Sequence, residues 1–330
     1  MIRLIGAPQH YAWGSTSAIP HALGLDPDGE PWAELWWGTH PGGHTLAEHD
    51  GDARPLVDLA GHLPFLVKLL AADRPLSLQV HPTTEQAAAG YAHEEHLGVP
   101  ITAPHRVYRD PYAKPELVIA VTAFRALCGF RPVEEAAAEI EGAGSATVAS
   151  HLRAHGPSAT VAWLLHERPA VELDHPRFTH LNADYPGDPG AVVALLLNEV
   201  LHAPGEGLFV GTGVLHTYLG GVGLEVMSSS DNVVRAGFTT KHIDTDELLA
   251  IVDVSPLVSP VAEPVRDGAW LRYRSPTPGF TVAHAASTVI LADGHHRIVA
   301  FLDERPVRVV HLGPDESLEA GRGAWVCTQI

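Results

Sequence analysis

Four polar side chains in three separate segments have the types and the spacing of a metal site. Gln79 and His81 are two residues apart in a run, 75–81, that alternates apolar and polar residues as a half-solvated β-strand does. Side chains at i and i+2 of a strand point to one face, so both can reach the same ion. Glu116 directly precedes a further predicted strand, and His216 lies at the start of another. A mixed set of imidazole, carboxylate and amide ligands, with room for a water, indicates a catalytic rather than a structural zinc site.

The spacing alone does not single out these residues. The chain has 22 histidines, so pairs at strand spacing arise by chance. A histidine on a strand is more often a structural or surface residue than a ligand, and His93, His96, His295 and His296 are most simply interpreted in that way. The metal hypothesis therefore needs support from the surrounding sequence.

The segments around these residues predict short β-strands on both sides of a helical stretch. The strand candidates are 75–81, 117–121, 126–130, 208–211, 213–218 and 223–227. Gly and Pro, with 31 and 27 residues, are as frequent as many strands joined by turns require. Residues 132–140 instead predict a helix, because a proline at the first turn precedes acidic residues and alanines. Helix-compatible patterns continue to about residue 195.

We therefore predict a mainly β fold, of the cupin or jelly-roll barrel type, with a helical insertion. Residues 1–130 and 196–255 are expected to form a catalytic, metal-bearing barrel, interrupted by a helical insertion at 131–195. Residues 256–330 are expected to form a second, smaller, cupin-like barrel. Such a barrel would be expected to continue for a strand or more beyond Ile330, so the second barrel could be incomplete.

The composition excludes some partners and creates a need for local positive charge. The formal net charge is −18, so neither nucleic acid nor an anionic membrane is an expected partner. There is no membrane-length apolar run, no signal pattern and no disulfide framework, since only two cysteines are present, so we predict a cytoplasmic protein. An anionic substrate would need several cationic side chains close together in its binding site. The only lysines, Lys68, Lys114 and Lys241, lie in segments with other candidate residues; for Lys68 we favour pairing with an acid over lining the pocket.

Several long stretches follow the pattern of a known enzyme family. They are LPFLVKLLAADRPLSLQVHP (63–82), YRDPYAKPELVIAVTAFRALCGFRP (108–132), FVGTGVLHTYLGG (209–221) and LEVMSSSDNVVRAGFTTKHID (224–244), with YAWGS (11–15) and PWAELWWGTHP (31–41) near the N-terminus. In these stretches the chain closely resembles the type I phosphomannose isomerases. The resemblance runs from near residue 8 to about residue 255, and SDNVVRAG (230–237) is highly specific.

The resemblance implies a zinc enzyme with one Zn²⁺ per chain that interconverts D-mannose 6-phosphate and D-fructose 6-phosphate through a cis-enediol. The residues that match the family's zinc ligands are Gln79, His81, Glu116 and His216. Arg235 matches the family's catalytic arginine and is also a candidate for binding the substrate phosphate. Lys241 matches a lysine that helps to hold the phosphate, and Ser77 matches a serine near the same group.

The reaction needs a base that moves a proton between C2 and C1, and the sequence offers three candidates. Glu225 lies on the strand after the one that His216 begins, and Lys114 would have a depressed pKa beside a zinc ion. Asp231 is the less favoured third candidate. Glu225 could instead pair with Arg235, and Lys114 could bind a sugar hydroxyl, so the choice stays open.

One departure from the family's pattern lies directly before Lys114. Tyr112 and Ala113 stand where family members often carry Asn-His before the Lys-Pro-Glu. Any role of that histidine in catalysis or ring opening is therefore absent here or passes to another group.

Other functions remain open at the level of sequence. A cupin dioxygenase would use mostly histidine ligands with iron, which a glutamine ligand and the cations argue against. A non-catalytic cupin that senses or binds a sugar phosphate would need no proton-transfer groups, and an isomerase of free mannose would need no phosphate site. The expected partner is a small sugar phosphate; the sequence predicts neither the oligomeric state nor whether the pathway is sugar catabolism or the supply of GDP-mannose.

Overall fold

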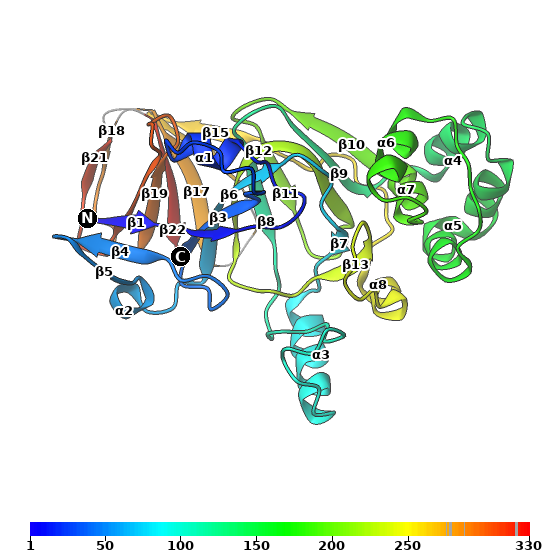
Figure 1. The fold of residues 1–330 in the computed structure, drawn as a ribbon, viewed down its shortest axis with the longest axis horizontal. Coiled ribbons are helices and arrows are strands. Elements are labelled where there is room, and N and C mark those ends of the chain that lie inside the picture. The colour runs from blue at the N-terminus through cyan, green and yellow to red at the C-terminus, as the bar shows by residue number, and fades with distance from the viewer. Residues whose placement is uncertain (275, 277–278, 287, 321–322) are drawn as a thin grey trace.

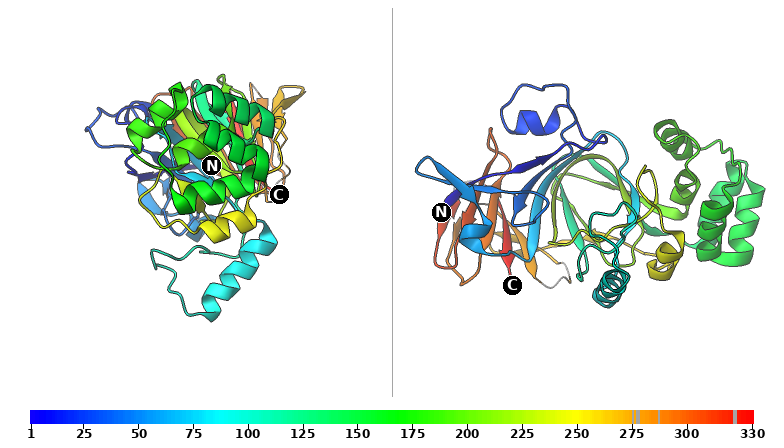
Figure 2. Two further views of the ribbon diagram at one scale, coloured as in Figure 1. Left: turned by 90° about the vertical axis from the view of Figure 1, so that its right-hand side faces the viewer. Right: turned by 60° about the horizontal axis from the view of Figure 1, so that its bottom comes forward.

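The computed structural model describes residues 1–274, 276, 279–286, 288–320 and 323–330, and within them the chain is mainly β. Two large antiparallel sheets lie next to each other, and most helices gather beyond one of them (Figure 1). Figure 2 shows the arrangement from two other sides, with helix α3 (Thr84–His96) projecting from the body. The predicted mainly β fold with a helical segment is confirmed. In the described ranges, no helix is long and apolar enough to span a membrane.

The larger sheet carries the candidate metal ligands. Among the described residues it has eleven strands, with β14-β11-β8-β12-β6-β3-β2 as its main path and the others attached through β12 and its neighbours. The bounds are β2 (Ala7–Gln9), β3 (Glu34–Gly38), β6 (Phe65–Ala72), β7 (Leu78–Val80), β8 (Glu116–Ala120), β9 (Phe124–Phe130), β10 (Leu197–His202), β11 (Gly207–Val210), β12 (His216–Ser228), β13 (Val234–Gly237) and β14 (Val261–Ala262).

The long strand β12 brings several predicted site residues into register. Its first half pairs with β7 and β9, and its second half runs between β6 and β8. The cross-strand pairs that concern the site are His216 with Gln79, Glu225 with Lys68, and Met227 with Glu116. The register with β9 shifts between Tyr218 and Gly220, where the strand changes partners. One strand therefore aligns residues that are far apart in the sequence.

The side chains of strand β6 point alternately to two different environments. Phe65, Val67 and Leu69 belong to the apolar core between the two sheets, where the rings of Phe65 and Phe280 are 6.4 Å apart. The intervening residues, including Lys68, point to the opposite face because successive strand side chains alternate. All eight residues of β6 are buried, so Lys68 is a buried charge that requires a partner.

The second sheet combines strands from both ends of the chain. Its nine strands in the described part follow the order β15-β16-β17-β22-β19-β20-β1-β4-β5. The bounds are β1 (Ile2–Ile5), β4 (Leu46–His49), β5 (Asp52–Pro55), β15 (Pro264–Asp267), β16 (Trp270–Tyr273), β17 (Phe280–Ala285), β19 (Arg297–Phe301), β20 (Arg308–Leu312) and β22 (Ala324–Gln329), with β18 (Thr288–Ile290) and β21 (Leu318–Ala320) forming a separate pair.

This pairing bears on the predicted division of the chain. Strand β1 pairs with β20, so the N-terminal strands extend the sheet formed by residues after 256, although the sequence analysis assigned all of 1–130 to the first barrel. Strand β14, in turn, pairs with β11 of the larger sheet. The alternation within a strand does not reveal its distant partner. The division at residues 130, 195 and 256 remains a prediction.

The helical segment packs behind the ligand strands. The helices between β9 and β10 are α4 (Val133–Gly142), α5 (Ala146–Glu167), α6 (Pro176–Asp184), α7 (Gly190–Val193) and the 3₁₀ helix η1 (Ala194–Leu196). Their apolar side chains share one core with Leu78 and Val80 of β7 and with Leu215, just before β12. The remaining helices are α1 (Ala18–Ala22), α2 (Val57–Ala60) and α8 (Thr245–Ile251).

Helix α3 is an element that the sequence analysis did not predict. It begins with a capping box, in which the Gln86 backbone N–H donates to Thr83 Oγ1 and the Thr83 N–H donates to Gln86 Oε1. The buried Arg106 holds the loop after the helix by donating to Glu95 and to the Tyr108 carbonyl. The Thr-x-x-Gln spacing was the available signal.

We expect Gly221→Ala to destabilise the fold. Gly221 has φ of 111°, and an added Cβ would lie 2.4 Å from the Ala123 carbonyl oxygen. The free energy of unfolding should therefore fall by about 1–3 kcal/mol or more. The control is Gly142→Ala in α4, where an added Cβ meets no atom within 4 Å and stability should be unchanged or rise by up to about 1 kcal/mol. Chemical denaturation measures both; equal effects would contradict the strain argument.

Candidate metal centre

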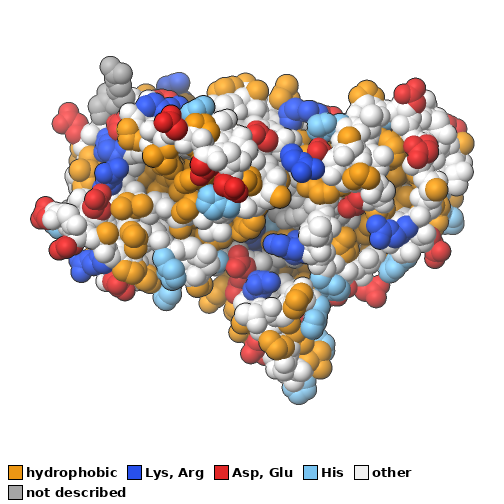
Figure 3. All heavy atoms as spheres, viewed as in Figure 1, with side chains coloured by type: hydrophobic (Ala, Val, Ile, Leu, Met, Phe, Trp, Pro, Cys, Tyr) orange, Lys and Arg blue, Asp and Glu red, His pale blue; other side chains and the backbone are white. Residues whose placement is uncertain are grey.

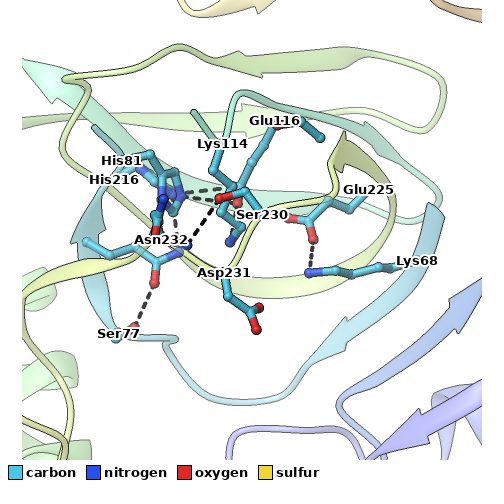
Figure 4. Close-up of polar contacts among 12 residues, drawn as sticks. Lys68, Ser77, His81, Lys114, Glu116, His216, Glu225, Ser230, Asp231 and Asn232 are labelled. Atoms are coloured by element: carbon cyan, nitrogen blue, oxygen red, sulfur yellow. Dashed lines mark hydrogen bonds and ion pairs between the residues drawn. The ribbon is translucent and has the colours of Figure 1, made fainter. Parts of the chain in front are cut away.

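Three buried side chains of ligand type converge at the ends of separate strands. His81 follows β7, Glu116 begins β8 and His216 begins β12, and their ligand atoms all lie within 4.8 Å of one another. His81 Nε2 is 3.1 Å from Glu116 Oε1, and His216 Nε2 is 3.5 Å from Glu116 Oε2. Two ligands of a tetrahedral zinc ion, at bond lengths of about 2.0–2.1 Å, are themselves about 3.3 Å apart. The separations therefore suit one ion (Figure 4).

The hydrogen bonds of both imidazoles leave the correct nitrogen free for a metal. His81 Nδ1 lies 2.7 Å from the Asn232 carbonyl oxygen, and His216 Nδ1 lies 2.9 Å from the Val214 carbonyl oxygen. Carbonyl oxygens only accept, so each Nδ1 carries the proton and each Nε2 presents a lone pair. His81 Nε2 is buried and has no hydrogen-bond partner in the described structure. Two lone pairs facing a buried carboxylate form a donor set that fits a divalent cation.

Gln79 lies next to this group. Its side-chain amide nitrogen is 3.4 Å from His216 Nε2, and its Oε1 accepts a hydrogen bond of 2.9 Å from Ser77 Oγ. Rotation of the terminal amide by half a turn would exchange the two atoms and present the oxygen that a metal needs. Ser77 therefore has a candidate ligand as its direct partner, and its assignment to the phosphate remains a prediction.

Glu116 is held ionised by its neighbours. Lys114 Nζ lies 2.9 Å from Glu116 Oε1, and the Tyr218 hydroxyl donates to Oε2 at 2.8 Å. Burial alone would raise the pKa of Glu116, but the Lys114 ammonium holds that pKa well below its usual range. Burial, followed by the Glu116 charge, raises the pKa of Tyr218, which stays a neutral donor.

A second buried charge cluster contains the other acid–base candidate. Lys68 Nζ is 2.7 Å from Glu225 Oε2 and 3.6 Å from Glu34 Oε1, and Glu34 also accepts a 2.7 Å hydrogen bond from Trp36 Nε1. Lys68 thus pairs with an acid, as favoured from the sequence, and Lys68, rather than Arg235, is the partner of Glu225. Burial raises the pKa of Glu225 against the opposing effect of Lys68.

Cations gather near the metal group. Arg235 in β13 pairs with Gln79 in β7, and Lys241 lies over the ring of Tyr11, with Nζ 5.6 Å from its centroid. Burial lowers the pKa of Arg235, and so does the nearby Arg109; burial, Arg235 and Arg109 lower the pKa of Lys241. Three cations that repel one another favour a bound anion. The surface is hollowed near α3, with basic side chains at its edge (Figure 3).

Asn232 connects the ligand group to the loop before β8. Its Oδ1 accepts from the Arg109 N–H at 2.8 Å, while its Nδ2 donates to the carbonyls of Asp110 and Tyr112 at 2.7 and 2.8 Å. Its own carbonyl is the partner of His81 Nδ1. The Tyr112-Ala113 departure therefore lies in a loop fixed through backbone atoms.

Sequence reasoning missed Asn232, Arg109, Tyr11 and Glu34 as parts of this site. All four lie inside the stretches that carry the family resemblance. Their types were informative, but no local spacing connects them with the ligands.

Comparisons with known proteins identify the family to which this chain is similar. A family model described as the catalytic domain of phosphomannose isomerase type I matches residues 1–133. The mannose-6-phosphate isomerase of Escherichia coli (strain K12) is 35% identical over 321 residues, covering 85% of this chain and 82% of the relative. The chain belongs to the type I phosphomannose isomerase family. The human mannose-6-phosphate isomerase is 31% identical over 346 residues, covering 84% of this chain and 79% of the relative.

Solved structures of the phosphomannose isomerases extend the likeness to the whole fold. The crystal structure of mannose 6-phosphate isomerase from Salmonella typhimurium, bound to its substrate fructose 6-phosphate and to zinc, has a TM-score of 0.84 and 31% sequence identity. The alignment covers 100% of both chains. The cupin-type fold expected from the resemblance is thereby confirmed.

Replacing one imidazole should remove the metal. We expect His216→Ala to lower zinc affinity by more than about tenfold, because even the loss of a residue that only supports a ligand costs about 10–100-fold. Metal analysis of the purified protein after gel filtration provides the measurement, and circular dichroism verifies the fold. The exposed His295→Ala is the control and should retain the metal content of the unchanged chain. Full zinc content in His216→Ala would exclude this residue as a ligand.

Asn232→Asp tests the connection between the loop and the ligands. The variant keeps the size of the side chain, but a carboxylate would face the Asp110 and Tyr112 carbonyl oxygens. We expect a loss of about 1–3 kcal/mol in the free energy of unfolding, measured by denaturation. Asn182→Asp is the matched control, since within the described part of the chain only the oxygen of Asn182 is used, as an acceptor from the Gly187 N–H. A similar loss in both variants would contradict the argument.

Proposed function

We propose that this chain is a zinc-dependent aldose–ketose isomerase that interconverts D-mannose 6-phosphate and D-fructose 6-phosphate. The observation that carries the proposal is the buried His81, Glu116 and His216 group with two free imidazole lone pairs. The 35% identity to the mannose-6-phosphate isomerase of Escherichia coli and the likeness to a structure with fructose 6-phosphate and zinc support the substrate and the metal. The protein would act in the cytoplasm on a small sugar phosphate.

The metal would be held by His81, Glu116 and His216, with Gln79 as the fourth ligand. A bound Zn²⁺ supplies Lewis acidity that stabilises negative charge on the substrate oxygens. Lys114 lies 2.9 Å from the Glu116 carboxylate, so its ammonium can donate a hydrogen bond to a sugar oxygen that approaches this group. The burial of His81, Lys114, Glu116 and His216 excludes most water and strengthens each interaction. Gln79 is half-buried.

Proton transfer between C2 and C1 would use Glu225 and Lys114. Glu225 faces the same side of the sheet as Lys68 and is buried, which raises its pKa and makes it a better base than an exposed carboxylate. The Lys68 ammonium stabilises the ionised form of this carboxylate and so opposes the rise in its pKa. Lys114 would exchange protons with, or donate hydrogen bonds to, the oxygens of the cis-enediol.

Arg235, Lys241 and Ser77 would bind the phosphate. Burial, followed by Arg235 and Arg109, lowers the pKa of Lys241, and an anion that binds beside these cations would relieve their repulsion. The planar guanidinium suits two phosphate oxygens, while the ammonium acts as a mobile point charge. Arg235 also adjoins Gln79 and can therefore act near the reacting oxygens.

The direct experiment is turnover. The purified protein with zinc should convert mannose 6-phosphate into fructose 6-phosphate, and removal of the metal by a chelator should abolish this activity. A coupled assay for fructose 6-phosphate measures the rate. Tight binding of mannose 6-phosphate without any turnover would indicate a sugar-phosphate sensor and overturn the proposal.

Lys241→Ala separates phosphate binding from the chemistry. Hydrogen bonds to charged groups contribute about 1.5–3 kcal/mol, so KM for mannose 6-phosphate should rise about 10–100-fold while any reaction of free mannose changes little. Steady-state kinetics on both sugars measure the effect. The control is Arg272→Ala, a surface residue paired with Asp267, which should leave KM unchanged. Equal losses on both sugars would remove Lys241 from the phosphate site.

A further inference from the structure

Glu34 is a buried carboxylate to which the proposed reaction assigns no task. It begins β3 and is only 6% exposed. Its Oε2 accepts a 2.7 Å hydrogen bond from Trp36 Nε1, and its Oε1 lies 3.6 Å from Lys68 Nζ. A buried carboxylate is costly unless its charge is compensated. Within the described part of the chain, Lys68 is the one cation recorded in contact with Glu34.

The Lys68 ammonium is therefore shared between two acids. Its other and closer partner is Glu225, whose Oε2 lies 2.7 Å from Lys68 Nζ. Burial would lower the pKa of Lys68, but the charges of Glu225 and Glu34 raise that pKa above its usual value. Lys68 thus stays an ammonium and acts as a fixed positive charge between the two carboxylates.

The pairing of three neighbouring strands fixes this arrangement. Trp36 of β3 lies opposite Lys68 of β6, and Lys68 lies opposite Glu225 of β12. Glu34 is two residues before Trp36, so its side chain points to the same face of the sheet. The ammonium also lies over the Trp36 ring, with Nζ 5.1 Å from the ring centroid. The Lys68 side chain is therefore held from the β3 side as well as from the β12 side.

The two oxygens of Glu225 have different surroundings. Oε2 faces Lys68, and although the ammonium is 2.7 Å away, no hydrogen bond within the described residues reaches this buried oxygen. The other oxygen is turned toward Lys114 and the metal group (Figure 4). The ammonium thus compensates the charge of the carboxylate from one side and leaves the opposite side free.

We propose that Glu34 is a positioning residue that holds the Lys68 ammonium at one oxygen of Glu225, so that the other oxygen stays free to take a proton from carbon. The inference rests on the proposed function. In that reaction the free oxygen takes the proton from C2 of the open-chain sugar, the C–H electron pair forms the C1–C2 double bond, and the carbonyl pair passes to O1. The O2 hydroxyl proton then passes to O1, O2 forms the C2 carbonyl, and the double-bond pair takes the proton back from the carboxyl group at C1.

Loss of the Glu34 charge would leave Lys68 with one anionic partner in place of two. The ammonium can then lie between both oxygens of Glu225 and donate to each, which occupies the free oxygen and makes the carboxylate a weaker base. Burial raises the pKa of Glu225 and Lys68 lowers it, while Glu34 acts in the same direction as burial. The other ionisable groups that face Glu225 are Glu116, Lys114 and Tyr218.

Glu34→Gln removes the charge with little change of shape, and its amide oxygen can still accept from Trp36. We expect kcat to fall about tenfold with KM for mannose 6-phosphate changed less than about twofold, because the loss falls on proton transfer and not on phosphate binding. Glu34→Asp keeps a carboxylate on the same face and should recover most of the rate. The control is Glu48→Gln, an acid of β4 paired with Arg3, which should leave both constants unchanged.

The isotope effect identifies the step that Glu34 supports. With mannose 6-phosphate deuterated at C2, the primary isotope effect on kcat should be at least as large in Glu34→Gln as in the unchanged chain, because proton removal from carbon becomes slower. In a Lys68→Met background, Glu34→Gln should cause little further loss. A rise in KM without a loss of kcat, an isotope effect that falls toward 1, or no recovery in Glu34→Asp would overturn the inference. Absence of turnover in the unchanged chain would instead overturn the proposed function.

A measurement on the ammonium itself does not depend on turnover. The chain has only three lysines, so ¹⁵N labelling of lysine gives few side-chain resonances, and the one that is lost in Lys68→Arg identifies Lys68. That resonance should shift in Glu34→Gln, return toward its original position in Glu34→Asp, and stay unchanged in Glu48→Gln. An unmoved resonance in Glu34→Gln would overturn the positioning role. Failure of Glu34→Gln to fold, followed by thermal denaturation, would also overturn it, because Glu34 would then support the fold rather than the position of Lys68.

Discussion

The structure depends on keeping one buried carboxylate, Glu116, ionised. Removing a carboxylate from water is costly unless its charge is compensated and its oxygens are hydrogen-bonded. Here Lys114 and the Tyr218 hydroxyl satisfy the oxygens directly, and two imidazole lone pairs face the same atoms. Lys114 supplies one positive charge, but the two lone pairs repel the carboxylate, and a bound divalent cation would replace that repulsion by coordination. The site therefore couples metal binding to the stability of the strands that carry the ligands.

Strand β12 explains how this compensation is achieved with groups that are distant in sequence. Its pairing sets His216 beside Gln79 at one end and Glu225 beside Lys68 near the other. The two charge clusters are therefore on one continuous strand, and a shift of register by a single residue would turn both of them to the opposite face. The apolar core shared with the second sheet holds that register, because Leu224 and Val226 of β12 pack in it between the polar positions.

The sequence offered candidate site residues, but it did not predict how the strands connect. Alternation and i, i+2 spacing made Gln79 and His81 candidates, and the long motifs added Glu116, His216, Arg235 and Lys241. The structure brings His81, Glu116 and His216 together. The contact between Lys68 and Glu225 depends on the pairing of β6 with β12, which local sequence patterns do not reveal. The role of Asn232 likewise depends on the folded loop of residues 109–112, which packs against it. Helix α3 was missed although its capping residues were visible, because the neighbouring segments are strands.

Because β1 pairs with β20, the first strand to be synthesised is completed late in folding. Ile2 pairs with His311, so a ribosome must complete almost the whole chain before the first strand it made can find its partner. Until then β1 offers unpaired backbone groups that can pair with other chains. A C-terminal truncation before β20 would leave that edge of β1 unpaired, while its other edge could still pair with β4.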